Sequence, residues 1–370
     1  MRILYCSQDY SPHDHRFLSA LHESGHDIYW LRLEKGSIVQ ESRPIPGGIK
    51  PVLLKKNQGK ISWSSYLEWN ARFQRIVREI KPDVVHAGPV QRVALIPALA
   101  GFHPLLTMSW GFDLMQDACR DPLWRWVTHY VLKRSDWFIA DCQAVLGKAR
   151  QFGLTHQNIS IFPWGVDLEM FNPKQRASMR KQVGFEDDIL ILHTRSWEPR
   201  YGVDIALRGF WLAQQKVPNL RLLMLGGGSQ EKEIRQFVET KGLSDRVHFY
   251  GYQDNNALAK YYQAADLYLS ASHIDGSSVA LLEAMACGCP ALVSDIPSNL
   301  EWVEHEMNGM VFKDSDAEGL AVKLVLLAAN KKKLIEMGEQ AHQKMVEKAD
   351  WKKGVQALMQ TYQRIMEEKS

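Results

Sequence analysis

Two carboxylates with seven residues between them are the most informative chemical feature of the sequence. Asp275 follows a predicted strand that ends near Ser270, and Glu283 lies inside a helix predicted to begin at Ser277 or Ser278. Carboxylates placed in this way can accept hydrogen bonds from hydroxyl groups on either side of a bound diphosphate. The alternative is a helix-capping aspartate and a solvent-facing glutamate, but Glu283 lies in an apolar run, where a charge needs a partner.

The turn between the two carboxylates is suited to a bound phosphate. The first turn of a helix has backbone N–H groups without partners inside the helix, and the helix dipole adds a partial positive charge there. The predicted phosphate pocket consists of Gly276, Ser277, Ser278 and Val279. A glycine run, 226–228, lacks dinucleotide-loop or P-loop spacing, so we interpret it as a tight strand-to-helix turn near the cleft, with Gly227 as a contact of the sugar donor.

Strands that position these residues are predicted from short apolar, β-branched runs that alternate with amphipathic stretches. In the first half these runs are Arg2–Cys6, Asp27–Leu33, Asp83–His86, Pro104–Ser109, Trp137–Ala140 and Ile159–Phe162. In the second half they are Ile189–Thr194, Arg221–Leu225, Val247–Tyr250, Asp266–Ser270, Ala291–Ser294 and Met310–Phe312. Alternation of strands with helices predicts parallel sheets covered by helices.

The alternation occurs twice, which predicts two domains. Phe162–Pro173 is rich in Pro, Gly and Asp and is interpreted as the connection between the halves. We therefore predict an α/β protein with two Rossmann-like, doubly wound domains that face each other across a cleft, residues 1–165 and residues 166–351.

Composition and charge narrow the class of protein. The 370 residues are 45% hydrophobic and 24% charged, which is typical of globular proteins. A net charge of only +3 disfavours a nucleic-acid partner. Residues 1–160 hold 20 Lys and Arg against 14 Asp and Glu, whereas the remainder holds 25 against 28. The basic first half predicts an anionic partner there, such as a phospholipid surface or a phosphorylated acceptor.

Cellular location is predicted from cysteines and apolar stretches. Five scattered cysteines are typical of reduced thiols in a cytosolic protein. The N-terminal residues do not resemble an export signal, and we expect no membrane-spanning segment. The expectation is a cytoplasmic protein, with peripheral contact at the inner membrane face left open.

Several segments resemble one enzyme family in their order along the chain. The stretch from Ser272 to Asp295 resembles the E-x7-E region of retaining glycosyltransferase family 4, a group with the GT-B fold. The other similar segments are Lys81–Ala87, Pro163–Phe171, Thr194–Asp204, Leu225–Gly228, Tyr250–Gly251 and Ala264–Ser270. Each motif alone is unspecific, and the ordered set is specific.

The resemblance implies a nucleotide-diphosphate sugar held mainly by the second domain. By match to the motif, Glu283 binds the ribose hydroxyls, Asp275 contacts the donor sugar, and Arg195 contacts the diphosphate. A guanidinium suits two phosphate oxygens and offsets the charge of the leaving group. The family resemblance also implies that the C-terminal helix, residues 352–370, returns to complete the first domain; a dimer helix is the alternative.

The sequence departs from the family pattern at three places. Asp275 stands where the family often has Glu, so its side chain is one methylene shorter. Tyr201 stands where many members have Lys, and either the Arg200 side chain or the Tyr201 hydroxyl is a candidate to replace that lysine. In the first domain, Ser11–Phe17 replaces the usual glycine pair. His13, His15 and Arg16 are the candidate phosphate or acceptor contacts, and the alternative is a polar helix start with Asp14 near the N-cap.

Ser109–Asp113 resembles the family's His-Gly-x-Asp segment, with Trp110 in place of His. Asp113 is a candidate to orient the acceptor hydroxyl or the donor sugar, and the alternative is an aspartate that caps a tight turn. Aromatic and basic residues also interleave in 63–78 and 124–134. This pattern fits either a membrane-surface helix or core packing with arginines on the wet side.

The predicted function is a retaining hexosyltransferase that moves a sugar from a nucleotide diphosphate to a hydroxyl of a glycan or glycolipid. No cofactor is expected. No tightly bound metal is expected either, because no third ligand lies at the spacing of a metal site from His13 and His15. Two alternatives stay open: a GT-B protein that only binds nucleotide or glycan, and a nucleotide-sugar epimerase.

Overall fold

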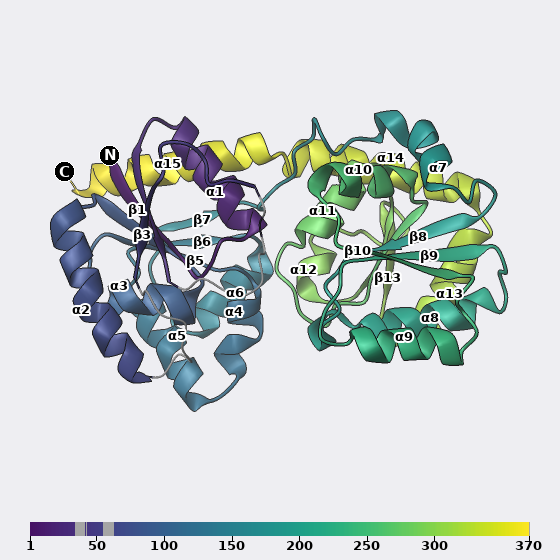
Figure 1. Cartoon of the computed structure of the whole chain (residues 1–370), viewed down its shortest axis with the longest axis horizontal. Coiled ribbons are helices and arrows are strands. Elements are labelled where there is room, and N and C mark those ends of the chain that lie inside the picture. Colours follow the sequence, from purple (N-terminus) through teal and green to yellow (C-terminus); the bar gives the residue numbers. More distant parts are fainter. Residues whose placement is uncertain (34–40, 42, 55–62, 370) are drawn as a thin grey trace. The chain divides into compact units, whose positions relative to one another are not determined.

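A computed structural model describes residues 1–369 except 34–40, 42 and 55–62. The chain divides into two compact units (Figure 1). The first unit consists of Met1–Pro163 with Gly354–Ser370, and the second is Trp164–Lys353. Each unit is built on one sheet whose neighbouring strands are all parallel, which confirms the predicted α/β class with two doubly wound domains.

The first unit has a seven-stranded sheet of order β3-β2-β1-β4-β5-β6-β7. Its strands are β1 Arg2–Ser7, β2 Asp27–Arg32, β3 Lys50–Leu53, β4 Val84–Ala87, β5 Leu105–Met108, β6 Trp137–Ala140 and β7 Ile159–Ile161. Its helices are α1 Pro12–Glu23, α2 Trp63–Ile80, η1 Val90–Ala94, α3 Leu95–Leu99, α4 Phe112–Met115, η2 Asp117–Cys119, α5 Pro122–Arg134 and α6 Gln143–Gln151. In Figure 1, α1 lies on one face of this sheet and α2, α3 and α5 lie on the other.

The second unit has a six-stranded sheet of order β10-β9-β8-β11-β12-β13. Its strands are β8 Ile189–His193, β9 Leu220–Leu225, β10 Val247–Gly251, β11 Leu267–Ser270, β12 Ala291–Ser294 and β13 Gly309–Phe312. Its helices are η3 Pro173–Gln175, α7 Arg176–Val183, η4 Pro199–Tyr201, α8 Val203–Gln214, α9 Glu231–Thr240, α10 Asn255–Ala264, α11 Val279–Ala286, α12 Pro297–Leu300, α13 Ala317–Ala328 and α14 Lys331–Lys348.

Side-chain alternation along β8 shows how the second sheet is buried on both faces. Ile189 and Ile191 belong to the core beneath α8 and α13, whereas Leu190 and Leu192 belong to the core beneath α10 and α11. Successive side chains of a strand point to opposite faces, so a strand covered on both sides is apolar throughout. This is why the predicted runs match twelve of the thirteen strands in the described part of the chain to within about two residues.

Strand β3 was not predicted. It contains Pro51, and proline lacks the N–H that a central strand needs. In the structure β3 lies at one edge of the first sheet and pairs with β2. An edge position tolerates the missing donor.

The C-terminal helix α15, Trp351–Lys369, begins in the second unit and ends in the first (Figure 1). The Tyr362 hydroxyl lies 2.6 Å from Nδ1 of His86 in β4, and the Thr361 hydroxyl lies 2.6 Å from that of Ser160 in β7. Tyr362 is fully buried, so this face of α15 is part of the first unit's interior. None of the helices in the described ranges is long and apolar enough to span a bilayer.

Candidate functional site

The turn that precedes α11 is shaped by its own serines. Ser278 is the N-cap, and its hydroxyl accepts a hydrogen bond from the Leu281 backbone N–H at 3.4 Å. The Ser277 hydroxyl accepts from Nε1 of Trp302 at 3.1 Å. Both serines are buried and hydrogen-bonded, so they hold the turn between β11 and the start of α11 in place.

Arg195 lies just beyond β8 and reaches this turn. Its Nη2 lies 2.7 Å from Oδ2 of Asp275, and its Nη1 donates to the Ser278 hydroxyl at 2.9 Å. The guanidinium carbon lies 4.1 Å from the centroid of the Tyr201 ring. The structure therefore brings together Arg195, Asp275, Ser278 and Tyr201 at the N-terminus of α11. Tyr201 contributes its ring to Arg195, a contact that sequence reasoning did not foresee.

Burial and mutual charge set the electrostatics of this pair. Burial raises the pKa of Asp275, and the Arg195 guanidinium lowers it only in part, so the pKa stays above its ordinary value. For Arg195, burial lowers the pKa, but Asp275 and the surrounding tyrosines outweigh that effect and the pKa is raised. The cation is therefore permanent, and in the ligand-free chain its charge is offset by one carboxylate.

Glu283 lies in α11 and is buried, with 7% relative exposure. Burial raises the pKa of Tyr262, and the nearby Glu283 carboxylate raises it further. The Tyr262 hydroxyl lies 2.9 Å from that of Thr194, in the same loop as Arg195. Glu283 therefore lies near Tyr262, whose hydroxyl contacts Thr194. Neither residue was predicted, although a buried tyrosine needs a partner for its hydroxyl.

Close backbone contacts hold the surrounding loops. The Trp197 N–H donates to the Gly227 carbonyl at 2.9 Å. A Cβ on Gly228 would lie 2.4 Å from the Trp197 carbonyl oxygen. Gly202 has φ +57°, and a Cβ there would lie 2.1 Å from the Ala271 carbonyl oxygen. These glycines allow the loop that carries Arg195 to lie directly against its neighbours.

The predicted contacts Arg200, Gly227 and Gly276 lie on loops of the second unit, and Val279 is the first residue of α11. The His273 N–H donates to the Arg200 carbonyl at 2.9 Å, and the Arg200 guanidinium carbon lies 5.6 Å from the Tyr201 ring centroid. The Gly276 N–H donates to Oδ1 of Asp275 at 3.1 Å. The second unit therefore gathers all its predicted sugar-donor residues at the carboxyl edge of one sheet.

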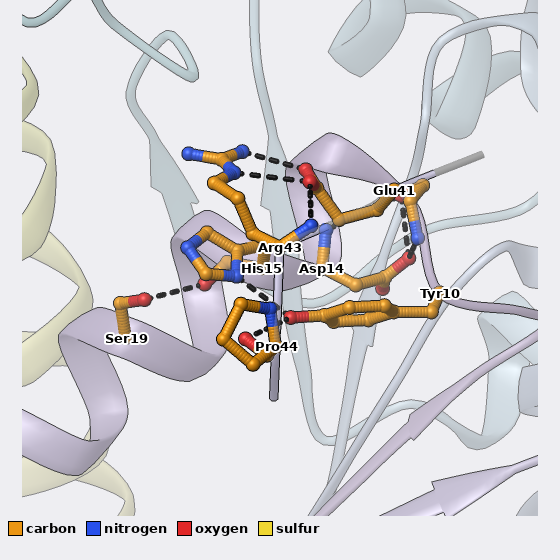
Figure 2. Close-up of polar contacts among 8 residues, drawn as sticks. Tyr10, Asp14, His15, Ser19, Glu41, Arg43 and Pro44 are labelled. Carbon is orange, nitrogen blue, oxygen red and sulfur yellow. Dashed lines mark hydrogen bonds and ion pairs between the residues drawn. The ribbon is translucent and has the colours of Figure 1, made fainter. Parts of the chain in front are cut away.

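In the first unit, His15 belongs to a polar cluster on the start of α1 (Figure 2). The Tyr10 hydroxyl lies 2.6 Å from Nδ1 of His15 and 3.1 Å from the Pro44 carbonyl oxygen. Arg43 donates to Glu41 from Nε at 3.0 Å and from Nη2 at 2.6 Å. Burial lowers the pKa of His15, and Arg43 lowers it further, so His15 stays neutral near pH 7.

Asp14 forms the helix start that was the alternative for this segment. It closes a capping box with Ser11, whose N–H donates to Oδ2 of Asp14 at 2.9 Å. The Tyr5 hydroxyl donates to Oδ1 at 3.0 Å. His13 and Arg16 lie on the same helix and are half-buried. The cap and the candidate contacts therefore coexist on α1.

His13 and Trp110 come together from distant segments. Their ring centroids lie 5.3 Å apart at an interplanar angle of 40°. His13 follows β1, and Trp110 follows β5. Strands β1 and β4 are neighbours in the sheet, and the strand order runs in opposite directions from them, which makes this the switch point of the sheet. Doubly wound sheets bind ligands at the carboxyl ends of the strands at such a point.

Asp113 is fully buried and holds its own turn together. Its Oδ1 accepts from the Ser109 hydroxyl at 2.6 Å and from the Trp110 N–H at 3.0 Å, and its Oδ2 accepts from the Val90 N–H at 2.9 Å. Burial raises its pKa to about 6, against the opposing effect of these hydrogen bonds. Asp113 therefore caps the turn that carries Trp110, as the alternative interpretation of this segment expected.

Metal ligands do not gather in the described ranges, where no group of three or more His, Cys, Asp or Glu side chains is close enough to hold an ion. His13 instead contacts Trp110, and His15 contacts Tyr10. All five cysteines are free thiols.

Solved structures define the class of fold. Sucrose-phosphate synthase from Thermosynechococcus elongatus matches with a TM-score of 0.84 at 18% identity, over 100% of both chains. HepE from Anabaena, solved in complex with UDP, matches with a TM-score of 0.80 at 18% identity, over 98% of this chain and 100% of its own. The fold is GT-B.

Two family models together cover most of the chain. "Glycosyltransferase Family 4" matches residues 13–170, and "Glycosyl transferases group 1" matches residues 175–344. The chain belongs to the group 1 glycosyltransferases of the family 4 type, which confirms the resemblance identified in the sequence.

Curated relatives are distant and longer. D-inositol 3-phosphate glycosyltransferase of Segniliparus rotundus is 27% identical over 250 residues, 66% of this chain and 56% of its own length. N-acetyl-alpha-D-glucosaminyl L-malate synthase of Bacillus anthracis is 24% identical over 228 residues, 61% of this chain and 59% of its own length. The match thus spans less than two thirds of these relatives.

Proposed function

We propose that the chain is a retaining glycosyltransferase that moves a sugar from a nucleotide diphosphate to an acceptor hydroxyl. The observation that carries this proposal is the Arg195 guanidinium, fixed at the N-terminus of α11 by Asp275 and Ser278. A helix N-terminus and a guanidinium together form a site for a diphosphate. The family assignment supports this reading, as do the UDP and UDP-glucose complexes of HepE.

Each residue of the site has a distinct role in this proposal. Glu283 binds the ribose hydroxyls, Arg195 binds the diphosphate, and Asp275 accepts hydrogen bonds from the sugar. On binding, Arg195 exchanges the Asp275 carboxylate for phosphate oxygens. In the reaction, the bond between the anomeric carbon and the diphosphate oxygen breaks, the acceptor oxygen bonds to that carbon, and the proton of the acceptor hydroxyl passes to the departing diphosphate. Arg195 and the α11 N–H groups stabilise the charge on the departing diphosphate.

The first unit supplies the acceptor side. His13, Arg16 and Trp110 lie near the switch point of its sheet, and Trp110 is partly exposed beside His13. We propose a glycan or lipid-linked acceptor there. His15 supports this surface through Tyr10.

We also propose that transfer proceeds without a tightly bound metal, because Arg195 and a helix N-terminus already supply positive charge at the leaving group. Five unpaired cysteines, four of them buried, favour a reducing compartment such as the cytoplasm.

The test is turnover of UDP-, GDP- and ADP-sugars without an acceptor. A transferase slowly hydrolyses its own sugar donor, and NMR of the released sugar reports retention at the anomeric carbon. Arg195→Gln is expected to slow this hydrolysis, whereas Arg235→Gln, an exposed arginine of α9, leaves it unchanged. An isomerised nucleotide sugar would identify an epimerase, and binding without turnover would identify a binding protein; either result refutes the proposal.

A further inference from the structure

Helix α5 of the first unit has an apolar stripe on its outer side. Its inner side, with Val127 and Val131, is buried in the core. On the outer side, Leu123 is 44% exposed and Trp126 is 53% exposed. Tyr130 continues this stripe one turn later, and its ring centroid lies 5.2 Å from that of Trp126. Large exposed apolar side chains in a row on one helix mark an interaction surface.

Cations surround the stripe. Arg125, Lys133 and Arg134 of α5 are exposed. Arg120 precedes the helix and lies over the Trp124 ring at 5.1 Å, and Arg134 lies over the Tyr130 ring at 3.9 Å. The guanidinium groups of these two arginines therefore lie over aromatic rings of α5, in the geometry of cation–π contacts.

Helix α6 adds to the same positive surface. The His129 ring nitrogen Nδ1 lies 3.1 Å from the Phe152 carbonyl oxygen, so the end of α6 packs beside α5. Lys148 and Arg150 are the charged residues of α6, and Arg150 is exposed. Neither helix contains Asp or Glu.

Three carboxylates that flank these helices in the sequence make local contacts or are buried. Asp121 caps α5 by accepting from the Trp124 N–H at 2.9 Å, and its Oδ2 lies 3.9 Å from Nε of Arg120. Asp136 accepts from the Leu105 N–H at 2.6 Å and contacts His103. Asp141 is buried. The outer side of α5 and the end of α6 thus present positive charge around apolar and aromatic side chains.

We infer that this surface, the outer side of α5 with Arg120 and Arg150, docks on an anionic lipid bilayer. The helix has 13 residues, so it is about 20 Å long, which suits a helix lying in the plane of the interface. Tryptophan and tyrosine prefer the headgroup region, and lysine and arginine are attracted by anionic lipids. A nucleic-acid surface would need the same cations but would leave Leu123 and Trp126 without an apolar environment.

The inference is independent of the sugar-donor site, because every residue that carries it lies outside the second unit. The test is flotation of the whole chain with vesicles of phosphatidylcholine, alone or mixed with phosphatidylglycerol. Binding is expected only to the mixed vesicles and is expected to weaken as salt is added. Two variants separate the contributions: Arg125→Gln with Lys133→Gln and Arg134→Gln, and Leu123→Ala with Trp126→Ala.

Matched controls come from exposed residues of the second unit. Lys331→Gln with Lys332→Gln and Lys348→Gln removes the same charge, and Val322→Ala with Leu326→Ala removes exposed apolar side chains. Loss of three cations from α5 is expected to reduce vesicle binding on the order of a hundredfold. The Leu123 and Trp126 variant is expected to lose binding too, and both controls keep it. No binding to anionic vesicles, or equal loss in variants and controls, overturns the inference.

Discussion

Neutralising Asp275 is expected to have opposite effects on product binding and on sugar transfer. In the ligand-free chain Oδ2 of Asp275 lies 2.7 Å from Nη2 of Arg195, so this carboxylate competes with a diphosphate for the guanidinium. UDP carries the diphosphate but lacks the sugar that Asp275 is proposed to hold. Asp275→Asn should therefore tighten UDP binding while it slows transfer.

The size of the effect follows from the geometry of the pair. Opposite charges about 4 Å apart attract by about 4 kcal/mol at an effective dielectric constant of about 20. The side chains of Arg195 and Asp275 keep 13% and 14% exposure, so solvent screens part of this energy. Taking about a third of it, 1.4 kcal/mol, predicts about tenfold tighter binding of UDP.

Isothermal titration calorimetry with UDP measures the dissociation constant directly. Glu231→Gln is the matched control, because it changes the net charge of the second unit equally but lies on α9 in an exposed pair with Arg235. The control should bind UDP as the parent chain does. A folded Asp275→Asn variant with unchanged or weaker UDP binding would show that Arg195 does not receive the diphosphate.

Three further outcomes are expected. His193 is buried, and neither ring nitrogen has a hydrogen-bond partner within the described ranges. Burial lowers its pKa to about 3 in the folded chain. As the pH falls from about 7 toward 3, His193 is therefore protonated in the unfolded chain but not in the folded one, which lowers the free energy of unfolding. His193→Leu should therefore remove about 2 kcal/mol of acid destabilisation at pH 5, measured by unfolding at pH 7 and pH 5. Asp113→Ala should leave buried donors without acceptors and cost about 3 kcal/mol of unfolding free energy, while calorimetry shows unchanged UDP binding. Gly202→Ala should cost more than about 1 kcal/mol and weaken UDP binding, because φ +57° and the Ala271 carbonyl oxygen both resist a Cβ.

The sequence was informative about the fold because parallel sheets bury both faces. Strands such as β8 and β12 are continuous apolar runs, which periodicity identifies easily. Strand β3 was missed since its signal combines a proline with partly exposed residues. An edge strand tolerates residues such as proline that a central strand excludes, so its sequence pattern is less distinctive.

The site was predictable in its residues but not in its contacts. Asp275 and Glu283 share one local motif, so spacing alone relates them. The Arg195–Asp275 pair joins two loops that only the order of strands brings together, and β8 and β11 are neighbours in the sheet although far apart in sequence. The aromatic contact of Tyr201 depends on a side-chain orientation that no sequence pattern encodes.

The central claim is that the second unit binds a nucleotide diphosphate through Glu283, and thermal-shift binding tests it most directly. Wild type, Glu283→Gln and the exposed control Glu239→Gln are each heated alone and with UDP, GDP or ADP. A nucleotide at about one hundred times its dissociation constant stabilises the folded state by about 2.7 kcal/mol. We expect one nucleotide to stabilise wild type and the control but not Glu283→Gln. No shift with any nucleotide, or an equal shift in all three proteins, would contradict the account.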